Sequence, residues 1–99
     1  MSEFACNMGA MNQAQRLRHA ALSKQLFANV ERHETDNGYV FTFPNEMSLA
    51  ALAEWVSLEQ KCCPFFDFRI DVPSANRAIS LSLTGQSGIK EFIRTELGQ

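Results

Sequence analysis

The chain has 99 residues, 45% of them hydrophobic and 10% aromatic, and a formal net charge of -2 at pH 7. This composition excludes a disordered chain, and the length predicts one α+β domain over residues 1–99. The slight negative charge predicts no nucleic-acid binding, which needs clustered Lys and Arg. Because no apolar run approaches the roughly 20 residues of a membrane helix and the chain starts without a signal-peptide pattern, we expect a cytoplasmic protein that does not interact with membranes.

The first half of the chain predicts a lead-in segment, a helix and a hairpin. Residues 1–10 show no periodicity and form the lead-in. Asn12 can cap a helix in which apolar residues recur at steps of three and four as far as about Val30. The Asn37-Gly38 pair then supplies the positive backbone angles of a tight turn between two strands, ERHET and YVFTFP.

The second half of the chain predicts two further helices and two further strands. Ser48 can cap a helix that stops at Pro64, because the residue before a proline is pushed out of the helical region. Residues 66–72 and 79–83 alternate apolar and polar side chains, as half-buried strands do, and Ser87 can cap a short last helix. The order αββαββα predicts a two-layer sandwich, a mostly antiparallel four-stranded sheet with helices on one face.

The stretch LEQKCCPFF places two adjacent cysteines, Cys62 and Cys63, at the carboxyl end of the second helix. Neighbours on a helix point about 100° apart, but a break before Pro64 allows the two sulfurs to converge on one ion. Thiolates are the ligands of soft ions, so the pair predicts a site for Zn(II), Cu(I), Hg(II) or As(III). Cys6 would be a third ligand if the lead-in folds back, and Glu59 lies on the same side of the helix as a ligand or hydrogen-bond acceptor.

Two other hypotheses stay open. The number of cysteines is odd and two of them are adjacent, which argues against structural disulfides, so the thiols are expected to be reduced. Reduced thiols could, however, simply pack as small hydrophobic residues. The protein would then be a non-enzymatic interaction module or a homodimer. A thiol-dependent enzyme ranks last, since the helix dipole disfavours a thiolate at this end and no general base is visible beside the pair. His19 and His33 lack metal-ligand spacing and are expected on the surface.

The middle of the chain resembles a group of small, largely uncharacterised bacterial proteins that carry E-x-x-C-C-P-F, here Glu59 to Phe65. The likeness extends to Cys6-Asn7, to Asp36-Asn37-Gly38-Tyr39, and to Leu83-Thr84-Gly85 with Lys90-Glu91-Phe92. The adjacent cysteines are also similar, as a short motif, to those of thiol-rich proteins that handle mercury and arsenic. The resemblance therefore favours a metal site and implies no catalytic role.

Overall fold

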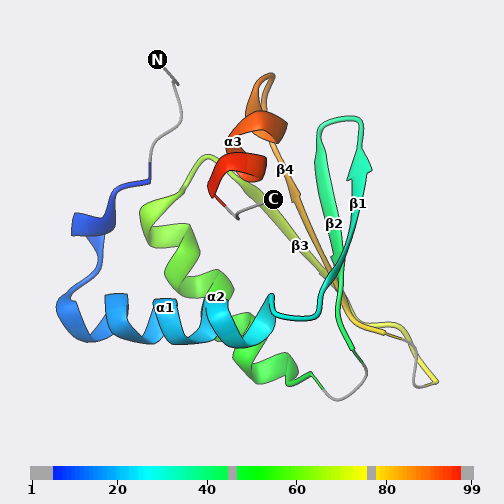
Figure 1. The fold of residues 1–99 in the computed structure, drawn as a ribbon, viewed down its shortest axis with the longest axis horizontal. Coiled ribbons are helices and arrows are strands. Elements are labelled where there is room, and N and C mark those ends of the chain that lie inside the picture. Colours follow the sequence, from blue (N-terminus) through cyan, green and yellow to red (C-terminus); the bar gives the residue numbers. More distant parts are fainter. Residues whose placement is uncertain (1–5, 45–46, 76–77, 97–99) are drawn as a thin grey trace.

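The helices and strands of the protein follow one another in the predicted order (Figure 1). A computed structural model describes residues 6–44, 47–75 and 78–96. Its elements are η1 (Met8–Ala10), α1 (Gln13–Leu26), β1 (Glu31–Thr35), β2 (Gly38–Thr42), α2 (Leu49–Cys62), β3 (Asp67–Asp71), β4 (Ser80–Thr84) and α3 (Ile89–Glu96). The predicted α+β class and the order αββαββα are confirmed. Residues 1–5 of the predicted lead-in lie outside the described residues.

The two long helices begin where the sequence places their caps. The side chain of Asn12 accepts a hydrogen bond from the Gln15 N–H at 2.8 Å, and Gln15 Oε1 accepts one from the Asn12 N–H at 2.9 Å. This reciprocal pair satisfies two N–H groups at the start of α1. Ser48 Oγ accepts from the Ala51 N–H at the start of α2. Helix α1 ends at Leu26 rather than near Val30, because residues 28–29 turn the chain into β1.

The four strands form one antiparallel sheet in the order β1-β2-β4-β3. The predicted hairpin joins β1 and β2, but the positive backbone angles predicted at Asn37 and Gly38 are wrong, because the described residues with positive φ are Ala75 and Gly88. A glycine is needed at this position for another reason, which is that the backbone of β4 leaves no room for a side chain. A Cβ there would lie 1.9 Å from the carbonyl oxygen of Leu83 on β4.

All three helices cover one face of the sheet, as predicted. The strand register places paired hydrophobic residues on this face, and they join the buried residues of the helices in a single core cluster. That cluster includes Leu22 and Leu26 of α1, Leu52, Trp55 and Cys62 of α2, Ile89 and Ile93 of α3, and Tyr39, Phe41, Leu81 and Leu83 of the sheet. No helix among the described residues is long and apolar enough to span a membrane.

Candidate metal centre

The predicted pair of cysteines lies at the carboxyl end of α2, with the helix break between them. Cys62 is the last helical residue, while Cys63 leaves the helix with φ -129° and ψ 68°, and its N–H still donates to the Glu59 carbonyl at 2.7 Å. Both side chains are fully buried, and their Sγ atoms lie 3.7 Å apart. Two sulfurs bound to one tetrahedral ion at about 2.3 Å are about 3.8 Å apart. The two sulfurs therefore converge as the sequence predicts.

The lead-in folds back onto the end of α2 and brings Cys6 to the pair. The Asn7 N–H donates to the Cys62 carbonyl at 2.7 Å, and Met11 anchors the segment with only 1% of its surface exposed. These contacts hold the Cα atoms of Cys6 and Cys63 4.8 Å apart, within the range of a disulfide, and the two residues form one. The expectation of reduced thiols is thus wrong for Cys6 and Cys63 in this structure, while Cys62 keeps its thiol.

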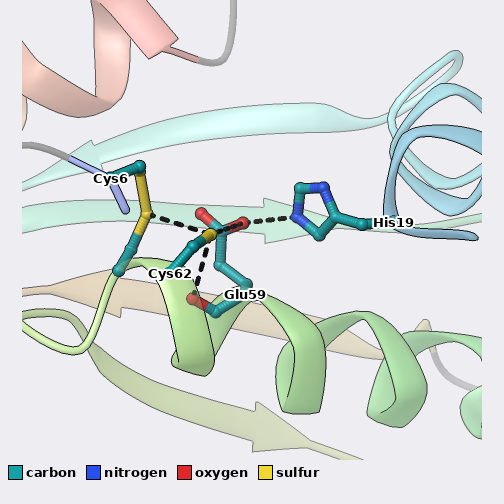
Figure 2. The surroundings of a disulfide bond; sticks show 5 residues. Cys6, His19, Glu59 and Cys62 are labelled. Atoms are coloured by element: carbon teal, nitrogen blue, oxygen red, sulfur yellow. Dashed lines mark hydrogen bonds and ion pairs between the residues drawn. A yellow bond between two sulfur atoms is a disulfide. The ribbon is translucent and has the colours of Figure 1, made fainter. Parts of the chain in front are cut away.

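Glu59 points from the preceding turn of α2 to the Cys62 thiol, as Figure 2 shows. Its Oε1 atom lies 3.9 Å from Cys62 Sγ, and its carbonyl oxygen lies 3.6 Å from the same sulfur. Glu59 is only 6% exposed, and among the residues that the structure describes it is the one that is both charged and buried. Burying a carboxylate is costly without a partner, so its surroundings decide what the site can do.

The partner of Glu59 is His19 on α1, a residue predicted from the sequence to lie on the surface. That prediction is wrong: His19 Nε2 lies 2.6 Å from Glu59 Oε1, and the imidazole is only 15% exposed. The signal that could have found it is helical spacing. His19 precedes Leu22 by three residues and Leu26 by seven, which places it on the buried side of α1 with both leucines. The second histidine, His33, is exposed as predicted.

The imidazole of His19 is held in place from α2. It stacks on the indole of Trp55, with ring centroids 5.9 Å apart and planes 18° apart. Trp55 is itself buried, and its Nε1–H donates to Ser23 Oγ at 2.8 Å. A histidine whose ring is fixed by neighbours presents its nitrogen in one direction, and here Nε2 faces Glu59.

Two sets of three donor atoms meet at Cys62. One set consists of the sulfurs of Cys6, Cys62 and Cys63, and the other consists of donor atoms from His19, Glu59 and Cys62. Within each set the donor atoms lie within 4.8 Å of one another. The structure therefore brings all four predicted ligand residues to one place and adds His19 to them.

A hollow of about 550 Å³ lies on the opposite face of the sheet. Its lining includes Thr35, Val40, Arg69 and Ser82, and none of the described residues that line it is a cysteine or a histidine. The sheet separates it from the cysteines, which lie with the helices on the other face. The hollow therefore takes no part in the thiol chemistry.

Comparisons of this chain with protein-family profiles, with curated proteins and with solved structures found no match. One α+β architecture carries many unrelated functions, so the fold alone does not select one. The side chains at the end of α2 are the better guide to function.

Proposed function

We propose that the reduced protein binds one soft metal or metalloid ion through the sulfurs of Cys6, Cys62 and Cys63. The observation that carries this proposal is the 3.7 Å separation of Cys62 and Cys63 Sγ, with Cys6 bonded to the second of them. Two-electron reduction of the disulfide by a small thiol leaves three thiols around one point. The cytoplasmic location predicted from the sequence would supply such a reductant.

Charge balance ranks the four candidate ions. Cys62 and Cys63 are buried, and an uncompensated charge in such a place is costly. Three thiolates carry three negative charges, so As(III) gives a neutral complex, whereas Hg(II) and Zn(II) leave one negative charge and Cu(I) leaves two. Zn(II) also prefers a fourth ligand in a structural site. A trivalent metalloid therefore suits the three sulfurs best.

A thiol-dependent enzyme is the second candidate, with Glu59 as its candidate base. Glu59 Oε1 lies 3.9 Å from Cys62 Sγ, close enough to receive the thiol proton. The thiolate of Cys62 could then attack Cys63 Sγ and release the thiolate of Cys6. The product would be a disulfide between adjacent residues, a small and constrained ring. That product makes exchange within the chain unfavourable, so ion binding stays the preferred function.

An interaction module or homodimer, with the cysteines in a structural role, is the third candidate. The face of the sheet that the helices leave open carries polar side chains such as Ser82 and Arg69. Among the described residues, the large hydrophobic side chains that are exposed are Leu17, Leu49 and Val72, which lie in α1, in α2 and after β3. Scattered apolar residues of this kind are normal on a monomer. The homodimer stays a prediction, which sedimentation at micromolar concentration tests.

The test of the proposed function is arsenite binding to the reduced protein after the reductant has been removed. We expect one ion per chain and protection of all three cysteines from alkylation, read residue by residue from peptide masses. Cys62→Ser and Cys63→Ser are each expected to weaken binding at least 100-fold, while Lys61→Ala, an exposed neighbour on the same helix, retains it. Circular dichroism is the control that checks whether the variants are folded. Unchanged affinity in both serine variants would overturn the proposal.

A further inference from the structure

We infer that Cys62, Glu59 and His19 form a second metal site, for a borderline divalent ion such as Zn(II), that is available while the Cys6–Cys63 disulfide is intact. The three residues bring a sulfur, an oxygen and a nitrogen donor within 4.8 Å of one another. None of these donors is consumed by the disulfide. The inference therefore does not rest on soft-ion binding, which requires reduction.

The distances are close to those of a metal centre. In tetrahedral Zn(II) sites with bonds of about 2.0 Å to nitrogen and oxygen and 2.3 Å to sulfur, the N–O and S–O separations are about 3.3 and 3.5 Å. Here His19 Nε2 lies 2.6 Å from Glu59 Oε1, and Cys62 Sγ lies 3.9 Å from the same oxygen. An ion would push the first pair apart by about 0.7 Å and draw the second pair together by about 0.4 Å.

The charge and chemistry of the donors select the class of ion. A thiolate and a carboxylate carry two negative charges and a neutral imidazole carries none, so a divalent ion makes the complex neutral. Neutrality matters because Cys62 is 1% and Glu59 is 6% exposed. Mg(II) and Ca(II) take oxygen donors, whereas a mixed set of nitrogen, oxygen and sulfur is typical of Zn(II).

The surroundings of His19 supply what a metal ligand needs. Its ring orientation is fixed by stacking on Trp55, whose own position is fixed by Ser23. The imidazole is also the most exposed of the three ligands, with 15% of its side chain at the surface. We therefore expect an ion to enter the site on the side of the imidazole. Three protein ligands leave a fourth position of a tetrahedral ion for water.

Cys62 belongs to both donor sets, so the state of the disulfide determines which ion the chain holds. With the disulfide formed, the sulfurs of Cys6 and Cys63 are not thiolates, and the set of nitrogen, oxygen and sulfur remains. After reduction, the three sulfurs together bind a soft ion and withdraw Cys62 from the set that it forms with His19 and Glu59. One chain thus binds one ion at a time, and reduction shifts the preference from a borderline divalent ion to a soft one.

The test is a titration of the oxidised protein with Co(II), whose absorption reports thiolate ligation and tetrahedral geometry. The intact disulfide is first verified by mass. We expect one Co(II) per chain, a thiolate-to-metal charge-transfer band, and displacement by Zn(II). His19→Gln and Cys62→Ser are each expected to weaken binding at least 10-fold. His33→Gln is the matched control, because this histidine is exposed on β1.

A measurement on the unaltered protein covers the case in which a variant fails to fold. Zn(II) should shift the NMR signals of the His19 ring and leave those of His33 in place. The inference is overturned if the oxidised protein binds no Co(II), if His19→Gln binds it as well as the unaltered chain, or if the His19 signals do not move. Reduced His19→Gln should still bind arsenite one-to-one, so failure of this site and failure of the soft-ion site are distinguishable.

Discussion

Glu59 is the residue on which the polar part of the site depends. Its carboxylate is buried at the junction of two helices, next to a thiol, with His19 as the ionisable partner that the structure places against it. Pairs of this kind contribute little net stability when intact, but removing one member leaves a buried charge without compensation. The two members of the pair should therefore respond unequally to substitution.

We predict that His19→Ala lowers the free energy of unfolding by about 3 kcal/mol, because it leaves the Glu59 carboxylate buried without its partner. Glu59→Gln should cost less, since a neutral amide is less expensive to bury and can still hydrogen-bond to the imidazole. Urea unfolding at neutral pH measures both values. Equal losses in the two variants, or a loss below about 0.5 kcal/mol for His19→Ala, would contradict this account.

At this scale the sequence identifies Cys62, Cys63, Cys6 and Glu59 but not His19. Three of the four lie on or next to one helix end, where a proline and helical spacing fix their relation locally. The pairing of His19 with Glu59 spans 40 residues and depends on how α1 crosses α2. The Cys6–Cys63 disulfide spans 57 residues and depends on the lead-in folding back. Local sequence patterns predict neither how α1 crosses α2 nor how the lead-in folds back.

Gly38 of β2 lies against the backbone of β4 with no room for a side chain. We predict that Gly38→Ala destabilises the protein by about 3 kcal/mol or more, because the added Cβ would lie 1.9 Å from the Leu83 carbonyl oxygen and 2.8 Å from Thr84 Cα. Both are backbone atoms of a paired strand and cannot move without disturbing the β2–β4 hydrogen bonds. Thermal unfolding, followed by circular dichroism, measures the loss.

Gly9→Ala is the control for this substitution. A Cβ at Gly9 would meet only the Asn7 Oδ1 atom, at 3.2 Å, and that side chain can give way. A change within about 0.5 kcal/mol is expected, as at ordinary surface positions. If both glycine variants lose the same stability, close approach to β4 is not the reason for Gly38.

Helix α3 is tied to β1 by an ion pair that should fail in acid. Lys90 Nζ contacts Glu34 Oε2 and donates to the Thr35 carbonyl at 3.1 Å. The hydrogen bond from Lys90, followed by its positive charge, holds the pKa of Glu34 below its ordinary value of 4.5. A lowered pKa in the folded state means that the pair stabilises the fold above pH 4.5 and loses this contribution as the pH falls through the lowered value.

We therefore predict that the stability difference between the unaltered protein and Glu34→Gln is present at pH 6 and disappears below the folded pKa of Glu34. Urea unfolding across pH 2–7 measures it. Because the pair is exposed, the difference should be small and should shrink in 1 M salt. A difference that stays constant from pH 6 to pH 2 would show that the carboxylate charge is not its origin.

At the element scale the sequence predicts the order of helices and strands, because their caps, the stop at Pro64 and the alternating strands are local features. It misses details that depend on neighbours. Asn37 and Gly38 lie at the hairpin, yet the glycine is needed for contact with β4 rather than for a positive φ. The end of α1 also differs, since the Val30 that fits the helical spacing belongs to the connection to β1.

At the scale of the whole molecule, the disulfide joins the start of the described chain to the end of α2. A crosslink between residues 57 apart lowers the conformational entropy of the unfolded chain. The loop-entropy relation converts this loss into about 4 kcal/mol of stabilisation of the folded state. We predict that reduction lowers the free energy of unfolding by about 2–4 kcal/mol. Cys6→Ser should show the same loss without a reductant. Oxidised Cys62→Ser keeps the disulfide and should not lose this contribution.

The same crosslink connects stability to the proposed ion binding. Reduction removes the covalent crosslink. An ion held by all three sulfurs would again connect the lead-in to the end of α2. A ligand present at a thousand times its Kd stabilises the folded state by about 4 kcal/mol, which is comparable to the loss on reduction.

We predict that arsenite raises the thermal midpoint of the reduced protein toward that of the oxidised form and has no such effect on reduced Cys6→Ser. Differential scanning calorimetry measures both. An equal rise in the variant would mean that Cys6 is not a ligand and that the ion is held by Cys62 and Cys63 alone.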